Sequence, residues 1–506
     1  MANEKKAGLL HASERDGVQY RKAPIWQMVI GMANNGVGVA FYLLMGFASM
    51  IAGQGYGIVA AVAGILLTCM RIFDGVTDTL IAALFEKFNP KKGKIRIFMI
   101  FGWALCITAC FMLYSWCTGK ADGIAGILLF LFCYFLFIMG YTFNGVGGGT
   151  VGIVMVNDPT QRPMMGVIGT IYSYCVPIIF TNITTFVILP KYDNQYNSAM
   201  FSEMIAWYAG ITLIFLIMAC IGVSKVDIQE TFATIKDGKK SEEKTSIKDM
   251  LAVLKDNKNV QMYMLTGVSD KLAQTVAGQG VIGNLLGGVL IGSYEATTMA
   301  GNFSTIIGIF FAFGSGIFVA KWGAKKSTTV WSWINIALAV GTVGFFLLLG
   351  GVTGMPKIGQ MWSIPFFIYV VICIVRGGAL MALTTTGSAM RADIVDYEYE
   401  RSGKYMPAVV AGVYSLIDKF VSSFGITIAM ICISFVGYSG TEVPQMGDEA
   451  TPGRFWMCMF LTLGLPIIGW LCNVIAMKFY DLSKERMVEV QKNLEERKKA
   501  AEGSAE

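Results

Sequence analysis

The residues best suited to chemistry are two carboxylates, Asp74 and Asp78, within an otherwise apolar stretch at 57–85. Their spacing places them on one side of a helix, about one turn apart, with Arg71 and Thr77 close by. An ionised side chain at the centre of a bilayer costs roughly 2.5–3.5 kcal/mol on insertion scales. Residues of this kind in such a stretch therefore mark a functional site.

Two carboxylates and a hydroxyl directed at one point supply the oxygen ligands that a hard cation such as Na⁺ prefers. The same pair can instead hold a proton, because burial and mutual repulsion disfavour two negative charges. A third interpretation is an ion pair with Arg71 that closes the helix bundle and binds nothing. Like charges one helical turn apart are a poor structural choice, so we favour cation binding.

Further charged residues lie in apolar segments of the second half of the chain. Asp270 and Lys271 are adjacent and point about 100° apart on a helix, so at least one needs another partner. Arg376 lies too far inside its segment for snorkelling to explain it, which leaves an anionic solute or a salt bridge to Asp270. Lys419 either balances the first carboxylate pair across the bundle or is neutralised by its neighbour Asp418.

A glycine-rich stretch at 141–150 has the sequence YTFNGVGGGT. Such a stretch can line a cavity, because it removes side chains, or it can allow tight helix packing, and the pattern does not separate the two. It is not a phosphate loop, since no GK[ST] follows. The polar side chains that we expect to contact a solute are Asn34, Asn35, Asn144, Asp270, Lys271, Gln274 and Arg376.

The composition is that of a membrane protein with several spans. Of 506 residues, 55% are hydrophobic and 15% are charged, against about 25% charged in an ordinary soluble domain. The 11 cysteines form no CxxC or Cys/His grouping, and His11 is the only histidine. These counts argue against a resident metal site or cofactor, a histidine proton relay and a Ser-His nucleophile. The net charge of +6 follows from basic cytoplasmic connections and does not indicate nucleic-acid binding.

Apolar stretches long enough to span a bilayer occur twelve times. We predict an all-α membrane protein with twelve transmembrane helices in two six-helix bundles, which is the major facilitator fold. The first six spans are expected at 25–52, 57–85, 96–116, 123–156, 163–190 and 204–223, and the second six at 259–292, 297–320, 328–350, 361–388, 407–437 and 453–478.

The only long hydrophilic interruption, at 224–258, divides the spans six and six and reads as a cytoplasmic linker with an amphipathic helix at about Ser246 to Asp256. Basic turns with glycine, at 89–94 and 321–326, lie at matching positions of the two halves, which is typical of a parallel repeat. The predicted domains are an arm at 1–23, a bundle at 24–223, the linker at 224–258, a bundle at 259–478 and a charged tail at 479–506.

Lys and Arg gather in alternate connections, such as those at 87–96 and 391–404, whereas the connections between them carry almost no positive charge. This asymmetry predicts that both termini are cytoplasmic. We expect an integral protein of a bacterial inner membrane that acts as a monomer, with lipid, a small solute and a coupling cation as its partners.

Four stretches resemble the glycoside-pentoside-hexuronide:cation symporter family of the major facilitator superfamily. They span nearly the whole chain, in order. They are RIFDGVTD at 71–78 with KGKIR at 92–96, GYTF at 140–143, IKDMLAVLK at 247–255, and ADIVDY at 392–397 through RSGK at 401–404 to YSLIDK at 414–419.

The resemblance implies a cation site for Na⁺, Li⁺ or H⁺ formed by Asp74, Asp78, Thr77 and Thr142, with Lys419 close to it. Thr77 stands where family members often have Asn. At the positions where melibiose-type members use Asp, Asp, Trp and Arg for the sugar, an ungapped local alignment places other residues here. They are Asn35, Gly145, Gly149 and Thr170.

We therefore predict a cation-coupled secondary symporter, driven by Na⁺ or H⁺, that carries a small organic solute by alternating access. The solute is expected to be a sugar or glycoside. The alternative is an amphipathic or anionic non-sugar, such as a steroid-like compound or an organic acid, because the melibiose-type contacts are missing. A membrane-embedded enzyme is disfavoured because no metal cluster or nucleophile-base set is present. A channel or transporter-like receptor is the other alternative, and the division into six and six spans argues against it.

Overall fold

The structure is a computed structural model of the chain. It describes every residue except 1–11, 16–17, 89, 92, 157, 159–160, 230–231, 233–254, 256, 403–406 and 504–506. The amphipathic linker helix expected at Ser246 to Asp256 therefore falls, apart from Lys255, outside the described residues.

The chain forms two compact units. The first comprises Met1–Glu242 with Gly437–Val443, and the second comprises Glu243–Val436 with Pro444–Glu506. The main division between them falls inside the hydrophilic stretch at 224–258.

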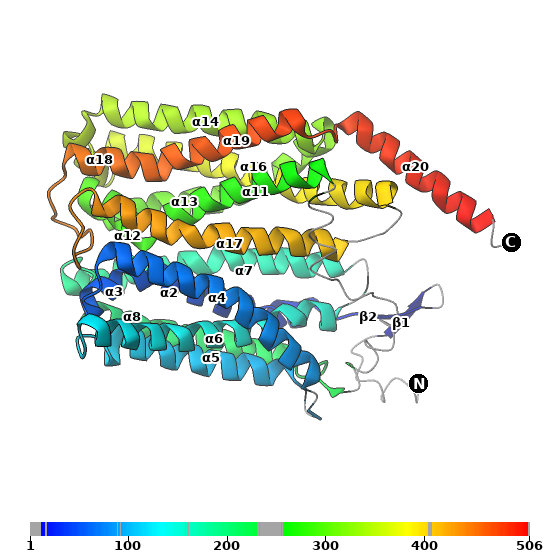
Figure 1. The fold of residues 1–506 in the computed structure, drawn as a ribbon, viewed down its shortest axis with the longest axis horizontal. Coiled ribbons are helices and arrows are strands. Elements are labelled where there is room, and N and C mark those ends of the chain that lie inside the picture. The colour runs from blue at the N-terminus through cyan, green and yellow to red at the C-terminus, as the bar shows by residue number, and fades with distance from the viewer. Residues whose placement is uncertain are drawn as a thin grey trace. The chain divides into compact units, whose positions relative to one another are not determined.

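The first unit is a bundle of long apolar helices, drawn from blue to green in Figure 1. A short hairpin of β1 (Ala12–Arg15) and β2 (Val18–Arg21) precedes the bundle. The helices are α1 (Ile25–Gly31), α2 (Asn34–Gly46), α3 (Ala48–Tyr56), α4 (Ala60–Lys87), α5 (Ile95–Phe111), η1 (Met112–Trp116), α6 (Gly123–Met155), α7 (Arg162–Asn182), η2 (Ile183–Ile188), η3 (Leu189–Tyr192) and α8 (Ser198–Val223).

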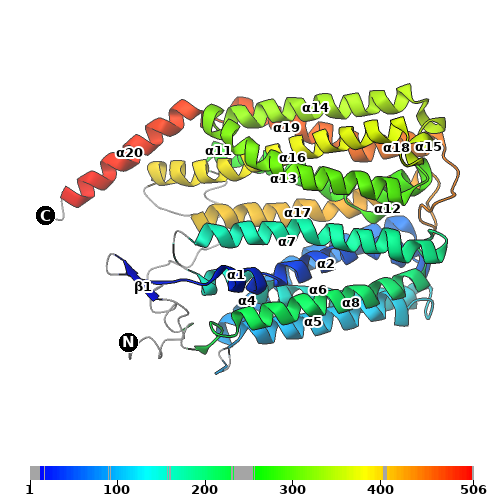
Figure 2. The ribbon, with the colours of Figure 1, turned by 180° about the vertical axis from the view of Figure 1, so that it is seen from behind.

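The second unit is a helix bundle too, in which α13 packs along α16, as both views show (Figures 1 and 2). Its last helix, α20, follows the bundle as a separate charged segment. The helices are α11 (Lys258–Ala277), α12 (Gly280–Asn284), η4 (Leu285–Leu290), α13 (Tyr294–Trp322), α14 (Ala324–Leu348), η5 (Gly351–Thr353), α15 (Pro356–Gly359), α16 (Ile364–Ser402), α17 (Pro407–Ser434), α18 (Pro452–Met459), η6 (Phe460–Gly464), α19 (Leu465–Phe479) and α20 (Lys484–Gly503).

The all-helical membrane architecture is confirmed, but the count of twelve spans is not. Within the described residues, ten helices are long and apolar enough to cross a bilayer, or eleven if the bent α13 is one span. The seventh predicted span, at 259–292, is divided between α11 and the shorter α12 and η4. Polar and charged residues, including Asp270 and Lys271, make α11 less apolar than the other long helices of the bundle, such as α13, α14 and α16.

Glycines bring α5 and α6 into close contact. A Cβ added to Gly140 would lie 2.5 Å from the backbone nitrogen of Cys106, and one added to Gly102 would collide with the backbone of Asn144. The two helices can approach this closely only because neither glycine has a side chain, as in other membrane helix pairs with small residues at the interface.

The basic turn before α5 is held by a buried carboxylate. Asp227, which follows α8, is fully buried and accepts hydrogen bonds from the backbone nitrogens of Lys94, Ile95 and Arg96 at 2.9–3.0 Å. The Arg96 side chain adds an ion pair at 3.2 Å. The carboxylate thus satisfies the free N–H groups at the start of α5 and complements the helix dipole.

The charged tail docks on the extension of α16. Gln491 donates to Asp396 at 2.6 Å, and Glu400 accepts from Arg486 at 2.9 Å and from Asn493 at 2.5 Å. On the same helix, Val490 and Leu494 are buried. The tail is therefore an ordered part of the second unit.

Candidate functional site

The carboxylate of Asp74 lies where α4 meets α6 in the first unit. It is only 7% exposed, and the Thr142 hydroxyl on α6 donates a hydrogen bond to its Oδ1 at 3.1 Å. The Thr77 hydroxyl is also buried, lies 3.5 Å from the Thr142 hydroxyl and donates to the Asp74 backbone carbonyl at 2.9 Å. Three of the four residues predicted for the cation site thus come together, and Asp78 follows one turn along α4, half-buried.

Arg71 does not close the bundle by pairing with these carboxylates. Its Nη1 donates to the Met45 sulfur at 3.8 Å, and its guanidinium carbon lies 5.6 Å from the centre of the Tyr42 ring. Among the described residues, none of the carboxylate oxygens lies within 4.0 Å of Arg71. The ring face offsets part of the charge, so the Asp74 carboxylate is left without an arginine partner.

Asn34 and Asn144 bond each other. The Asn34 amide nitrogen donates to Asn144 Oδ1 at 3.1 Å, and the Asn144 amide nitrogen donates to Asn34 Oδ1 at 3.2 Å and to the Met99 carbonyl at 3.2 Å. Both side chains are buried. Their amides join α2, α5 and α6 close to Thr142, and a contact of either residue with a solute stays a prediction.

One face of the glycine-rich stretch on α6 packs tightly, which is one of the two alternatives that the sequence left open. A Cβ on Gly148 would collide with the Asn34 amide, so this face of α6 packs tightly. Gly145 and Gly149 are exposed, and a Cβ on either would meet nothing within 4 Å. These two glycines, like the exposed Thr170 on α7, present no large polar side chain.

Asn35 is half-buried and turns toward α7, where a Cβ on Gly169 would lie 2.7 Å from its amide nitrogen. It remains a candidate solute contact from the first unit.

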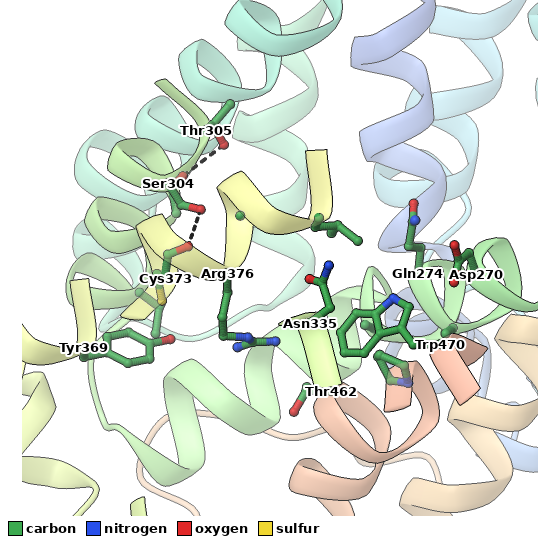
Figure 3. A pocket seen from close by; sticks show the side chains of 17 residues that line it. Asp270, Gln274, Ser304, Thr305, Asn335, Tyr369, Cys373, Arg376, Thr462 and Trp470 are labelled. Carbon is green, nitrogen blue, oxygen red and sulfur yellow. Dashed lines mark hydrogen bonds between the residues drawn. The ribbon is translucent and has the colours of Figure 1, made fainter. Parts of the chain in front are cut away.

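A cavity of about 360 Å³ lies inside the second unit (Figure 3). Helices α11, α13, α14, α16 and α19 and the turn η6 contribute to its wall. It brings together three residues predicted as solute contacts, namely Asp270, Gln274 and Arg376. A cavity of this size with a few polar groups is typical of a small-molecule site.

Arg376 extends from α16 into this cavity, toward Asn335 and Thr462 (Figure 3). Asp270 lies on the other side in this view, beyond Trp470. In the described part of the chain, no carboxylate oxygen comes within 4.0 Å of Arg376. The salt bridge between Arg376 and Asp270, which was one of the two alternatives, is therefore not formed in this structure. The Arg376 guanidinium faces the cavity instead.

Asp270 has a neutral partner. The Asn473 amide nitrogen lies 3.1 and 3.0 Å from its two oxygens, and Asn473 is fully buried on α19. The Ser269 hydroxyl donates to Asn473 Oδ1 at 3.4 Å, which agrees with the amide nitrogen facing Asp270. Asn473 was not predicted, and neither were Trp470, Asn335 and Tyr369, because single polar or aromatic residues in apolar runs give no sign of the face they occupy.

Lys271 lines a second, smaller cavity together with Asp270 and Gln274. Lys419 and Asp418 are both half-buried on α17. Because Lys419 belongs to the second unit and Asp74 to the first, a charge balance between them stays a prediction.

Comparison with known proteins places the chain among transporters. The family model described as MFS/sugar transport protein matches residues 28–484. The glucuronide carrier protein homolog of Escherichia coli K12 is 23% identical over 492 residues, which cover 94% of this chain and 96% of the relative. The putative glycoside/cation symporter YagG of the same organism is 21% identical over 466 residues, which cover 89% and 90% of the two chains.

Solved structures show the same fold. The nucleoside transporter NupG superposes with a TM-score of 0.53 at 11% identity, covering 90% of this chain and 99% of its own. A bacterial homologue of the iron transporter ferroportin gives 0.54 at 12% identity, with 90% and 98% covered. At such low identity these structures support the fold alone.

The buried carboxylate with its hydroxyls, the polar cavity and the apolar helices thus occur in a chain that matches one family model over most of its length. The chain belongs to the MFS/sugar transport protein family, resembles the glycoside/cation symporters within it, and is a membrane symporter rather than an enzyme.

Proposed function

We propose that this protein couples the movement of a solute to Na⁺ or H⁺ at a site made by Asp74, Asp78, Thr77 and Thr142. The observation that carries the proposal is the hydrogen bond from Thr142 to Asp74, which joins α6 to α4 over 3.1 Å. A buried carboxylate with two hydroxyls nearby supplies oxygen ligands for Na⁺. With H⁺ as the coupling ion, Asp74 itself carries the proton.

The site is suited to a transported cation, which must bind and leave in each cycle. No arginine neutralises Asp74, since Arg71 is directed toward Tyr42 and Met45 instead. A cation or proton that arrives therefore neutralises a buried carboxylate that forms no ion pair with Arg71. Lys419 on α17 is proposed to sense this change when the two bundles alternate their access.

The solute is proposed to be a sugar or glycoside that carries an acidic group and binds in the Arg376 cavity. Two relatives carry names that refer to glucuronide and glycoside transport. A guanidinium in a cavity, without a carboxylate of its own, matches a carboxylate on the solute. Asp270 and Gln274 offer hydrogen-bond acceptors for hydroxyl groups.

An amphipathic acid that is not a sugar is the second candidate. The observation that favours it is the exposed surface at Gly145 and Gly149, where a Cβ would meet nothing within 4 Å. This surface leaves room for a bulky solute. It offers no carboxylate or indole side chain that could bind a sugar ring.

The positive charge of alternate connections supports the orientation of the termini alone. We propose that both termini lie in the cytoplasm, in the inner membrane of a bacterium, and that one chain transports alone.

Counterflow in proteoliposomes tests the function. Liposomes loaded with D-glucuronides, neutral glycosides, organic acids or steroid conjugates are diluted into the labelled compound, with and without Na⁺ and at two pH values. We expect saturable exchange of an acidic glycoside that one of the two cations stimulates. Ion conductance without saturable exchange would instead identify a channel.

A further inference from the structure

A second cavity, of about 200 Å³, adjoins the Arg376 cavity within the second unit. Asp270 and Gln274, one turn apart on α11, line both cavities. The smaller cavity is lined further by Lys271 from α11 and by Arg391 from α16. It therefore collects two cationic side chains from two different helices.

Within the described residues, neither of these two cationic side chains forms an ion pair with a carboxylate. The Arg391 Nε donates to the Tyr263 hydroxyl at 2.9 Å, and its guanidinium carbon lies 4.8 Å from the centre of the Tyr414 ring. Over the residues that the structure describes, no carboxylate oxygen lies within 4.0 Å of Arg391 or Lys271. A hydroxyl and a ring orient the guanidinium but leave its charge available.

Among the described residues that line this cavity, Asp270 is the only carboxylate. Its oxygens are already engaged by the Asn473 amide at 3.1 and 3.0 Å. The described lining thus carries two positive charges and one negative charge, so its net charge is positive. Cavities lined by one sign of charge attract ions of the other sign.

We propose that the Lys271–Arg391 cavity is a second anion subsite, which takes the carboxylate of the solute or a free oxyanion such as phosphate. The part that concerns the solute rests on the proposed function. The geometry also suggests a path, because one continuous helix, α16, carries both arginines. Arg376 and Arg391 are separated by about 22 Å along the helix axis at 1.5 Å per residue.

The acid group of the solute therefore moves in two steps through the second unit. It binds Arg376 in the larger cavity, passes Asp270 and Gln274 at the junction, and is held again by Lys271 and Arg391. The second subsite binds only the charged group, since its volume is about 200 Å³.

Thermal unfolding of the purified full-length protein in detergent tests the subsite directly. Inorganic phosphate and D-glucuronate are titrated in separate series at constant ionic strength, so that screening by salt stays the same. The variants are Lys271→Met and Arg391→Met. Lys357→Met serves as the matched control, because Lys357 is an exposed lysine on α15 outside both cavities.

We expect a saturable rise in Tm for the wild type and for Lys357→Met, with the apparent Kd weakened at least tenfold in Lys271→Met and in Arg391→Met. A rise with glucuronate alone assigns the subsite to the solute's carboxylate, and a rise with both probes assigns it to oxyanions in general. An equal response of all four proteins, or no saturable response in any, would overturn the proposal. Retained counterflow of a neutral glycoside shows that the variants are folded.

The variant Arg376→Gln separates this proposal from the proposed function. If the Arg376→Gln variant transports an acidic solute as well as the wild type does, Arg376 does not bind the solute's acid group; the Tm series then still tests the second subsite. If Lys271→Met and Arg391→Met respond in the Tm series as the wild type does, the second subsite is wrong, and the role of Arg376 in binding the solute is unaffected.

Discussion

The hydroxyl of Thr142 donates a hydrogen bond to the carboxylate of Asp74 over 3.1 Å and so connects α6 with α4. The two residues are 68 positions apart in the chain, and both are buried. When a cation binds, a hydroxyl at this position can turn its lone pairs toward the cation. When none is bound, it can donate its hydrogen bond to the carboxylate. In the proposed cation site, this contact would link cation binding to the packing of α4 and α6.

Replacing Thr142 tests the role of its oxygen. Thr142→Ala removes one hydrogen bond to a charged group, worth about 1.5–3 kcal/mol, so the cation concentration for half-maximal uptake should rise roughly 10- to 100-fold by the same energy. Thr142→Ser keeps the oxygen and should stay within a few fold of the wild type. Initial uptake rates measured against Na⁺ concentration and against pH check this. Equal cation affinity in the alanine and serine variants would remove Thr142 from the site.

Arg376 should matter for charged solutes only. Arg376→Gln removes the guanidinium but keeps hydrogen-bonding capacity, so the KM for an acidic glycoside should rise roughly 10- to 100-fold, as for the loss of a charged hydrogen bond. The KM for the neutral methyl ester of the same compound should change little. Competition between acid and ester in proteoliposomes measures both values. An equal loss for acid and ester would show that Arg376 supports the fold of the cavity rather than the charge of the solute.

Two glycines of α6 should respond in opposite ways to the same change. Gly140→Ala places a methyl group 2.5 Å from the backbone nitrogen of Cys106, and such overpacking costs typically about 1–3 kcal/mol. Gly145→Ala meets nothing within 4 Å, and alanine is the better helix former by about 1 kcal/mol. Thermal unfolding in detergent should therefore show a lower Tm for the first variant and an unchanged or higher Tm for the second. The reverse order would contradict the packing of α5 on α6.

The Asn34–Asn144 pair should behave as one unit. Each single change to Leu leaves the other buried amide without its partner, whereas the double change removes both polar groups together. Interhelical hydrogen bonds in membrane proteins are worth about 0.6 kcal/mol on average and about 1.7 at most. We expect the double variant to lose clearly less stability than the sum of the two single variants. Strict additivity in a double-mutant cycle by thermal unfolding would show that the amides do not interact.

The fold could be predicted because the sequence features that indicate it, such as apolar stretches of a helix's length, are local and recur along the chain. Apolar stretches and their lengths place most of the helices within a few residues, and the composition excludes a soluble protein. The count of twelve is not confirmed within the described residues, since Asp270, Lys271 and other polar residues lower the hydropathy of α11 in the second half. The domain bounds and the cytoplasmic placement of the termini stay predictions.

Site residues could be predicted where a residue type is unusual for an apolar helix. They could not be predicted where their role depends on a hydrogen-bond partner that is distant in the sequence. Asp74 stood out because a carboxylate is rare in an apolar helix, and the resemblance to the symporters pointed to Thr142. The bond between the Asn34 and Asn144 amides could not be predicted, because one sequence cannot show that two distant amides face each other. Asn473 was missed for the same reason, since its importance comes from Asp270, about two hundred positions away.

Arg391 illustrates a third case. In the sequence it belongs to a basic stretch that explains the orientation in the membrane, and this explanation hid its place in a cavity. Only the length of α16, which continues from Ile364 to Ser402 without a break, brings Arg391 to the same cavity as Lys271.

The most direct test of the central claim is accumulation of the solute by proteoliposomes under an imposed Na⁺ or H⁺ gradient, compared between wild type, Thr142→Ser and Asp74→Asn. The account predicts that wild type and Thr142→Ser accumulate the solute with one of the two gradients, whereas Asp74→Asn does not accumulate it with either. Accumulation by Asp74→Asn equal to that of the wild type would contradict the assignment of Asp74 as the cation-binding carboxylate.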